Sequence, residues 1–408
     1  MTNSLATQKK ILPLALGAVV EGAYLYAGAD KGIEEEMQGK DNGDIIYYKT
    51  TDLGNPEFVD LSLDSDEGNG SGGDMSSTAV SHNVVPVTMF DSRIMYNVRA
   101  FEKQVTSIGS DLAYAKVGQK LAKKAVKEFI SKDILTIGNV FVASGASAFE
   151  AFQQAGAYMK SIVDGTLYGF MDWQVWGALT GKGQQAVPCA LAESRFGKNL
   201  VGSWSLIDQL RVIPDFEVRT GVACGAVASD GAVTLAKAAV TTAGVITITG
   251  TLPKGAMFTI DGVYAKDVND MPTPKLFTFV TTNSVATGTP LTAANSNAYF
   301  GADKAGVNKI AFVAPEKAIS ATEVTPVLTV DKKYAATIIR ADGAQAFGTM
   351  KTCDCEGAKY EKSSIDGINI HVNSGENVGA FKTDKRFDMI IASKLVEPRA
   401  ACVIWYEL

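Results

Sequence analysis

The chain has 408 residues, enough for two or three domains with a sizeable buried core. Hydrophobic residues make up 46% of the chain and charged residues 20%, which excludes a wholly disordered protein. The net charge of −6 argues against nucleic-acid binding over the whole surface, because that needs a basic protein. The cysteines are few, odd in number and scattered, which favours a reducing compartment over a disulfide framework: Cys189, Cys224, Cys353, Cys355 and Cys402.

Residues 1–50 have no long hydrophobic period and are predicted to form an N-terminal arm. They contain "KKILPLALGAVVEGAYLYAGAD", with two lysines, an apolar run from Ile11 to Val20 and a small-residue cleavage pattern, which is the shape of a secretory signal. The alternative is an apolar arm or helix that packs on a neighbouring surface, and the rest of the chain favours it. A membrane span needs about 20 apolar residues, and Glu21 interrupts this shorter run, so no membrane segment is expected.

An acidic, glycine-rich stretch follows, "DLGNPEFVDLSLDSDEGNGSGGDMSS", without a basic residue. Its Gly-Asn-Gly-Ser-Gly-Gly tip is predicted to be a flexible loop, and "NVVPVTMF" to return as a strand, so residues 51–95 are interpreted as a long extended hairpin. Asp60, Asp64, Asp66 and Glu67 are candidate calcium ligands, but they lack the fixed spacing of an EF-hand loop. Charge that faces solvent or a partner is therefore the favoured interpretation.

The clearest predicted helix lies in "SDLAYAKVGQKLAKKAVKEFI", where apolar residues recur at three- and four-residue spacing. From Ser110 to Lys132 it would be about 35 Å long. Lys116, Lys120, Lys123 and Lys124 lie on its other faces; a basic stripe of this kind could touch nucleic acid, but is more often a solvated face. An acidic extended loop that lies over a neighbour's basic helix would satisfy both features, which points to a self-assembling subunit.

The stretch from about 134 to 221 mixes predicted strands and helices. "NVFVASGASAFEAFQQAGAYMKSIVDG" predicts a strand and then a helix, and "YGFMDWQVWGALTG" predicts a strand that leads into a helix or turn. Residues 222–345 are rich in Thr, Val, Ala and Gly and alternate as in "GVITITG" and "KLFTFVTT", which predicts an all-β sandwich or barrel. Mixed α/β character returns near Phe347, so the β-domain is interpreted as an insertion into a mixed domain, with its two ends close together.

Within that β-region, "GTLPKGAMFTIDGVYAKD" is predicted to hold two strands that flank a Lys-Gly turn, with a second turn at Asp-Gly.

No stretch predicts an active site. "GALTGKGQ" resembles a phosphate-binding loop, but it has three residues between the glycines instead of four, and Gly183 stands where Ser or Thr would bind magnesium. Cys353 and Cys355 have no second Cys or His pair at zinc spacing. The two histidines, His82 and His371, stand in no recognisable motif. No catalytic, cofactor-binding or metal-binding residue is therefore expected, and the chain is not expected to be an enzyme.

Four stretches carry a resemblance to a known family. "YNVRAFEKQV" leads into the predicted helix, and "FGKNLVGSWSLIDQLRVIPDFEVRTG" precedes the β-region. "GVITITGTLPKGAMFTIDGVYAKD" resembles a core hairpin of an inserted domain, and "DMIIASKLVEPRAACVIWYEL" resembles a closing pair of strands around a proline. Their order resembles the major capsid (coat) proteins of tailed bacteriophages, which share the Hong-Kong-97-type fold. Within that group it resembles the P-twenty-two-like proteins, which carry an inserted β-barrel.

The resemblance implies an α+β fold with a particular division of the chain. It implies an N-terminal arm (1–50), an extended loop hairpin (51–95), a spine helix with a peripheral domain (96–134), the first part of an axial domain (135–221), an inserted β-barrel domain (222–345) and the second part of the axial domain (346–408). The inserted barrel, with its short-range strand pairing, could nucleate folding of the slower axial domain.

The implied function is mechanical. Subunits would form hexamers and pentamers of an icosahedral shell around double-stranded DNA, first as a procapsid with scaffolding protein and portal, assembled in the host cytoplasm. DNA contact would be non-specific, with no membrane and no cofactor. Subunit interfaces would pair Asp60, Asp64, Asp66 and Glu67 with Lys116, Lys120, Lys123 and Lys124 of a neighbour.

Three alternatives stay open: a secreted or surface β-rich structural protein, an encapsulin-like compartment shell, and a hydrolase that uses His371.

Overall fold

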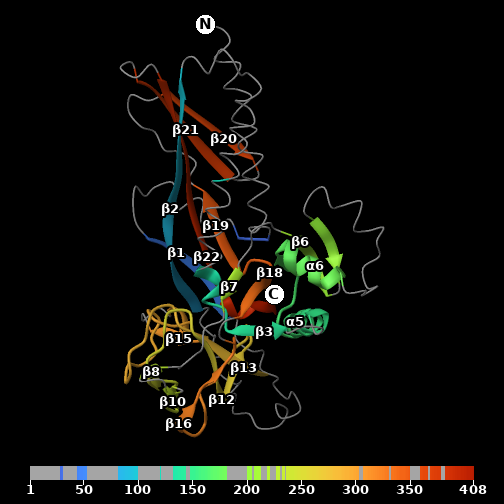
Figure 1. Ribbon diagram of the computed structural model, residues 1–408, viewed down its shortest axis with the longest axis vertical. Helices are drawn as coiled ribbons and strands as arrows, with labels where there is room; N and C mark the ends of the chain where they lie inside the picture. The colour runs from blue at the N-terminus through green and yellow to red at the C-terminus, as the bar shows by residue number, and fades with distance from the viewer. Residues whose placement is uncertain are drawn as a thin grey trace, which may run out of the picture.

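The structure is a computed structural model, and it describes residues 28–30, 44–52, 81–99, 120, 132–143, 148–181, 200–204, 206–212, 218–220, 227–229, 232–234, 236–302, 307–329, 332–349, 359–365, 368–377 and 382–408. These residues are largely β-structure. They form a long sheet, a main sheet with helices beside it, and a smaller body of short strands, which are visible in Figure 1 as three parts of an elongated molecule.

The long sheet has eight strands and follows the long axis of the molecule (Figure 1). Its strands are β1 (Asp44–Asp52), β2 (Ser81–Arg99), β14 (Tyr299–Ala302), β15 (Asn308–Ile310), β19 (Gln345–Thr349), β20 (Lys359–Ile365), β21 (Ile368–Asn377) and β22 (Lys382–Leu395). β2 pairs with β1 over one half of its length and with β22 over the other half, antiparallel in both cases. The predicted return strand of the extended hairpin is thus found in β2, although its partner β1 begins at Asp44 rather than at 51.

The main sheet has seven strands in the order β3-β23-β18-β4-β6-β5, with β7 paired to β18. Its strands are β3 (Asn139–Ala143), β4 (Leu167–Met171), β5 (Leu200–Trp204), β6 (Ile207–Val212), β7 (Val218–Thr220), β18 (Lys333–Ala341) and β23 (Ala401–Glu407). Two pairs, β3 with β23 and β4 with β6, are parallel. The predicted strand–helix pairs are confirmed, because α5 (Ala148–Ile162) follows β3 and α6 (Trp173–Gly181) follows β4.

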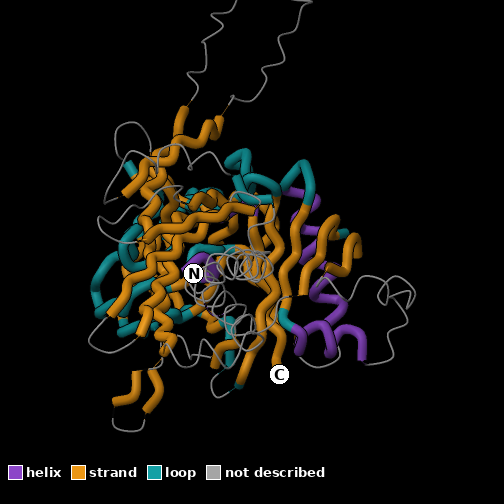
Figure 2. Tube along the Cα trace, turned by 90° about the horizontal axis from the view of Figure 1, so that it is seen from above, coloured by secondary structure: helices purple, strands orange, loops and turns teal. Residues whose placement is uncertain are grey.

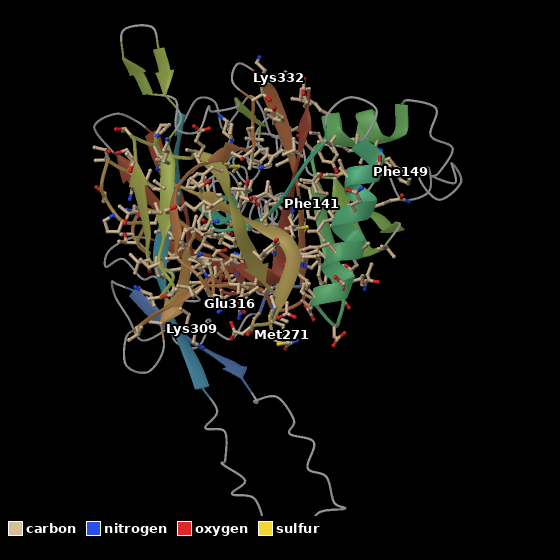
Figure 3. All side chains as sticks on the ribbon, turned by 90° about the horizontal axis from the view of Figure 1, so that it is seen from below. Phe141, Phe149, Met271, Lys309, Glu316 and Lys332 are labelled. Carbon is tan, nitrogen blue, oxygen red and sulfur yellow. The ribbon has the colours of Figure 1, made fainter. Side chains whose placement is uncertain are left out.

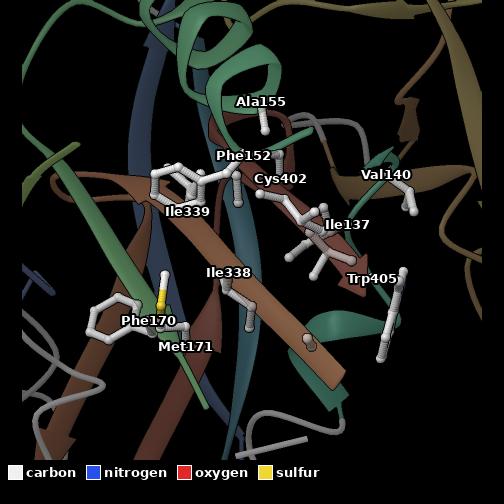
Figure 4. Close-up of a cluster of buried hydrophobic side chains, with 14 of the residues drawn as sticks. Ile137, Val140, Phe152, Ala155, Phe170, Met171, Ile338, Ile339, Cys402 and Trp405 are labelled. Atoms are coloured by element: carbon white, nitrogen blue, oxygen red, sulfur yellow. The ribbon is translucent and has the colours of Figure 1, made fainter. Parts of the chain in front are cut away.

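The core of the main sheet is apolar on both of its faces. Ile338 and Ile339 are consecutive on β18, so they point to opposite faces, and both are buried. α5 packs against β3, β18 and β23 through Phe152, Ala155 and Met159, all fully buried. Figure 4 shows Phe152 and Ala155 reaching from this helix towards the sheet, and Figure 2 shows α5 and α6 along one side of the strands.

The smaller body comprises residues 236–302 and 307–329 and is called the β-module below. It contributes β14 and β15 to the long sheet. Its other strands are β10 (Lys237–Val240), β11 (Ile246–Thr249), β12 (Met257–Lys266), β13 (Pro272–Val280), β16 (Ile319–Glu323) and β17 (Thr325–Pro326). They form two three-stranded sheets, β11-β10-β16 and β13-β12-β17. β8 (Val227–Ser229) and β9 (Ala232–Thr234) pair with each other just before the module.

Four phenylalanines fill the space within the β-module: Phe258, Phe277, Phe279 and Phe312, with ring centroids 4.9 to 5.8 Å apart. All four are buried, and they form a core cluster with β-branched and alanine side chains of the same body. The prediction of many short strands in this region is therefore confirmed.

The predicted pairing inside the β-module is wrong. β11 and β12, which flank the Lys-Gly turn, lie in different sheets, and each forms a hairpin with another strand, β10 or β13. The Asp-Gly pair does not end a strand either. Gly262, with φ of 80°, lies within β12, where the register with β13 shifts between Thr259 and Tyr264. A positive φ at glycine accommodates this bulge without ending the strand.

One predicted boundary also shifts. β18 lies before residue 345, yet it pairs with β4, β7 and β23 in the main sheet. The β-module therefore ends near 329. The strands that precede and follow it in sequence, β7 and β18, are antiparallel neighbours, with Thr220 opposite Lys333.

Of the predicted N-terminal arm, residues 28–30 and 44–50 are described. The backbone N–H of Asp30 donates to the carbonyl oxygen of Gln345 at 2.7 Å, so this part of the arm lies beside β19. Of the predicted spine helix, Lys120 is helical and exposed, and residues 132–134 are helical; the rest lies outside the described residues.

Candidate functional site

The residues predicted to form subunit interfaces fall almost entirely outside the described residues. This holds for Asp60, Asp64, Asp66 and Glu67 of the acidic loop, and for Lys116, Lys123 and Lys124 of the helix. Lys120 is described, and it is exposed. The proposed pairing of acidic and basic residues therefore stays a prediction.

The described residues offer little for catalysis. Gly177 and Gly181 of the phosphate-loop-like stretch lie within α6, so the backbone there is helical rather than a loop around a phosphate. His82 lies in β2 and His371 in β21. Burial raises the pKa of the Cys402 thiol to about 12, so this cysteine is no thiolate nucleophile at neutral pH. No group of three or more His, Cys, Asp or Glu that could hold a metal occurs in the described part of the chain.

No helix among the described residues is long and apolar enough to cross a membrane.

The most elaborate set of contacts in the described structure is the docking seam, where the β12–β13 hairpin lies along β3 and the loop before β23. On the hairpin it comprises Met257, Asp270, Thr273, Lys275, Phe277, Thr278 and Val280, and on the main body Gly138, Asn139, Phe141, Tyr158, Glu397 and Arg399. β3 ends the strand order of the main sheet, so the hairpin covers an edge. Figure 3 labels Phe141 of β3 and Met271 beside the hairpin's turn.

At one end the seam is apolar. Met257 and Val280 of the hairpin are fully buried in the same cluster as the side chains of the main sheet, together with Leu328 at the end of the β-module. Next to them the two backbones touch, since the N–H of Thr278 donates to the carbonyl oxygen of Gly138 at 2.9 Å. A Cβ at position 138 would lie 2.1 Å from Cε2 of Phe277, so this close approach requires glycine.

In the middle of the seam a lysine lies over an aromatic ring. The Nζ of Lys275 is 3.7 Å from the centroid of Phe141, and Phe141 in turn packs edge-on against Tyr158 at 5.7 Å. Burial lowers the pKa of Lys275 to about 8, and burial raises the pKa of Tyr158 to about 12. The Tyr158 hydroxyl therefore stays protonated. It donates a hydrogen bond to Oδ1 of Asn139 at 2.9 Å, and its oxygen lies 3.3 Å from Oγ1 of Thr273.

At the other end the seam is charged. Arg399 lies in the short 3-10 helix η6 (Pro398–Ala400), and its side chain is buried. Its Nε and Nη2 donate to the two carboxylate oxygens of Glu397 at 2.8 and 3.1 Å, and its Nη1 donates to Oδ1 of Asp270 at 2.7 Å. The ring of Phe300 covers the guanidinium, with 4.3 Å from Cζ to the centroid.

Asn139 joins the middle of the seam to its charged end. Its Nδ2 donates to the carbonyl oxygens of Arg399 and Ala401, at 3.1 and 3.3 Å, while its Oδ1 accepts from Tyr158. Buried polar groups are stable when they are hydrogen-bonded in this way. The seam thus fixes the position of the hairpin on the main body, and its arrangement is suited to docking rather than to chemistry.

A second polar cluster joins the helical turn at 132–134 to both sheets. Oδ2 of Asp133 accepts from Nε2 of Gln345 at 3.0 Å, and Oδ1 accepts from the N–H of Leu395 at 3.3 Å. Gln345 also accepts from Nη1 of Arg340 at 3.2 Å and donates to Oγ of Ser393 at 2.8 Å. Burial raises the pKa of Asp133 to about 6 despite these donors.

The seam residues do not stand out as a site in the sequence. One signal was present, in "LVEPRAACVIWYEL": Glu397 and Arg399 stand two residues apart within an apolar run, and such charges are rarely buried unless paired. Their partner Asp270 lies 129 residues away from Arg399, and nothing in the local pattern indicates it.

Comparisons with known proteins give matches at the level of structure only. No family model and no curated protein matches the chain. The chain is similar to the capsid of Ralstonia phage GP4, with 8% identity, a TM-score of 0.41 and coverage of 93% of this chain and 90% of that chain. It is similar to the mature capsid of bacteriophage PhiM1 (10% identity, TM-score 0.38, 91% and 83%) and to a virus-like particle from Pyrococcus furiosus (8%, 0.37, 97% and 98%).

The two phage structures are capsids, which is the class of protein that the sequence resembles.

Proposed function

We propose that this chain is the major capsid protein of a tailed bacteriophage and that it assembles into an icosahedral shell around double-stranded DNA. Two lines support the proposal: the order of motifs along the sequence, and an elongated molecule with a long projecting sheet. The observation that carries it is β2, a strand of 19 residues that pairs with β1 at one end and with β22 at the other.

The dimensions of β2 favour a subunit that reaches towards neighbours. At about 3.3 Å per residue the strand spans roughly 60 Å. A compact globule of this chain length has a radius of gyration of only about 22 Å, so the strand is about as long as such a globule is wide. β2 is paired along its whole length, so it carries the long sheet along the molecule, and in this proposal that sheet overlaps adjacent copies.

In this proposal the β-module is the inserted domain of the P-twenty-two-like capsid proteins. The pairing of β7 with β18 supports an insertion between them, because the chain leaves and re-enters the main sheet at adjacent strands. The main sheet with α5 and α6 would be the axial domain, in two parts that precede and follow the insertion. The long sheet would include the extended loop hairpin and part of the peripheral domain.

The subunit contacts in this proposal are those of the sequence analysis. Hexamers and pentamers form when the acidic loop of one copy lies over the basic helix of the next, with scaffolding protein and portal present in the procapsid and with non-specific contact to packaged DNA. Each exposed ion pair is worth about 0–1 kcal/mol, but a shell repeats it in every subunit.

The experiment that tests the function is electron microscopy of the purified full-length protein beside sedimentation, with and without a candidate scaffolding protein. Closed or curved shells are expected, and a stable monomer under every condition would contradict the proposal. Nucleic acid inside native particles would separate a phage shell from an encapsulin-like compartment. An N-terminus found intact by mass spectrometry would exclude the secreted alternative.

Charge reversal tests the interface. Asp60, Asp64, Asp66 and Glu67 replaced together by lysine should hinder assembly, because like charges would then face each other across the interface. Reversal of Lys116, Lys120, Lys123 and Lys124 to glutamate in the same chain should restore assembly, as judged by the sedimented fraction. Shells of normal yield from the first variant alone would eliminate this pairing.

A further inference from the structure

Arg399 binds two carboxylates that differ in burial, in the number of hydrogen bonds and in the part of the fold to which they belong. Glu397 lies two residues away in the same loop, is 4% exposed and receives two side-chain hydrogen bonds from the guanidinium. Asp270 belongs to the turn of the β12–β13 hairpin, is 45% exposed and receives one, from Nη1 at 2.7 Å. One carboxylate therefore always moves with Arg399, and the other moves with the hairpin.

This asymmetry lowers the cost of opening the contact. Loss of one partner from a buried ion pair is expensive mainly because it leaves the other charge buried and unpaired. If the hairpin turn lifted away, Arg399 would keep Glu397, and Asp270, which is already half exposed, would gain water. The Nζ of Lys266 lies 3.7 Å from Oδ1 of Asp270. It would stay beside this carboxylate, because both residues are on the hairpin.

The turn itself is preformed. Oδ1 of Asp267 accepts from the backbone N–H groups of Asn269 and Met271, both at 2.8 Å, and these bonds lie within the turn. Asp270 has φ of 62°, a left-handed conformation that is uncommon for a residue other than glycine. The turn therefore presents the Asp270 carboxylate in a fixed direction without help from Arg399.

The opposite end of the hairpin cannot leave the main body at low cost. Met257 and Val280 are fully buried in the core of the main sheet, and their removal would expose apolar surface on both sides. The two ends of one hairpin thus differ, since one is held by burial and the other mainly by a hydrogen-bonded ion pair. The turn end has two further contacts, of Thr273 with Tyr158 at 3.3 Å and of the partly buried Val268 with the core of the main sheet.

We propose that the contact between Arg399 and Asp270 is a releasable lock, which lets the turn end of the β12–β13 hairpin lift from the main body while Arg399 stays paired with Glu397. The lock allows the hairpin to tilt about its apolar end and to close again without a rearrangement of the main sheet. The inference goes beyond the proposed function and does not depend on it, because it concerns the fold of a single chain.

The test uses the full-length protein, with hydroxyl-radical footprinting and amide hydrogen exchange, both read by mass spectrometry. Asp270→Asn removes the charge and keeps a residue type that tolerates the left-handed conformation. The hydrogen bonds inside the turn would survive its lifting, so the readout is oxidation of Tyr158, which contacts Thr273 across the seam. Because a hydrogen bond to a charged group is worth more than a neutral one, we expect this oxidation to rise by roughly tenfold. The melting temperature and the exchange of β10 and β11 should stay close to those of the unmodified protein.

Two further variants make the result decisive. Glu397→Gln leaves Arg399 with only the exposed partner, so we expect a clearly lower melting temperature and faster exchange across β23 and β3. Asp261→Asn removes an exposed carboxylate elsewhere on β12 and should change neither quantity. The lock is overturned if Asp270→Asn leaves oxidation of Tyr158 unchanged, if it lowers the melting temperature as much as Glu397→Gln, or if Asp261→Asn raises that oxidation equally.

Discussion

The main sheet and the β-module are built from the same kinds of strand but are closed in different ways. In the β-module each hairpin joins strands that are close in sequence, such as β10 with β11 and β12 with β13. In the main sheet β23 lies between β3 and β18, so Asn139 reaches the carbonyl oxygen of Ala401 across 262 residues. Because local contacts form faster than distant ones, the module can fold early and the main sheet only when the last residues are available.

The cores of the two regions also differ, because one is local in the sequence and the other joins distant segments. The β-module is filled by a compact group of phenylalanine rings from three neighbouring stretches of chain. The main sheet depends on continuous apolar strands, such as Ala401–Tyr406, that are buried on both faces. In a region of the second kind the inner strands need partners on both sides and cover on both faces, so its parts depend on one another.

Trp405→Ala should have the largest effect and should affect only one region. Trp405 is fully buried on β23, and truncation of such a residue costs about 3–5 kcal/mol. We expect hydrogen exchange in β3, β4 and β18 to lose most of its protection while β10 to β13 stay protected. Phe279→Ala, a truncation of similar size in the module, should give the reverse pattern; equal loss in both regions from either variant would mean that the two fold as one unit.

Gly138→Ala should have an intermediate effect, confined to the seam between the regions. The new methyl group would lie 2.1 Å from Cε2 of Phe277, and overpacking of this kind costs about 1–3 kcal/mol. Exchange of the Thr278 amide, which donates to Gly138, should rise. Gly177→Ala is the matched control, because its Cβ meets nothing within 4 Å on α6; a loss of stability as large as that of Gly138→Ala would remove the steric explanation.

The most localised effect is a pH dependence of the main body, which rests on one carboxyl group. The pKa of Asp133 is raised from 3.8 to about 6 by burial, so the folded chain binds this proton more tightly than the unfolded chain. Its contribution to stability is therefore fully present below pH 4 and is lost as the pH rises through 6. The difference in urea midpoint between the unmodified protein and Asp133→Asn should fall between pH 4 and pH 7; a constant difference would show that Asp133 does not titrate in this range.

The sequence predicted the elements whose side chains follow a period. The helices after β3 and β4 and the short strands of the β-module were all evident from apolar spacing, because that spacing records which face is buried. It does not record which strand lies beside which. The Lys254-Gly255 turn therefore suggested a hairpin between β11 and β12 that does not exist, and β18 was assigned to the inserted domain instead of the main sheet.

The docking seam could not be predicted for a related reason. Gly138, Lys275 and Arg399 each look ordinary in their own segment, and their roles depend on partners far away in the chain. The predicted interface residues differ from the seam residues, because their charge pattern is conspicuous in the local sequence. All of them except Lys120 lie outside the described residues.

The pairing of β7 with β18 makes the junction between these strands a suitable place to insert another domain. Thr220 and Lys333 are cross-strand neighbours, and the Cα atoms of such neighbours in antiparallel pairs are about 4.5–5.5 Å apart. A turn of two residues could span that gap, and Arg399 would keep Glu397 if Asp270 were gone. Another domain could thus be inserted here if it covers the apolar surface that Met257, Val280 and Leu328 now bury, while the register of the main sheet is set by strands that the exchange leaves in place.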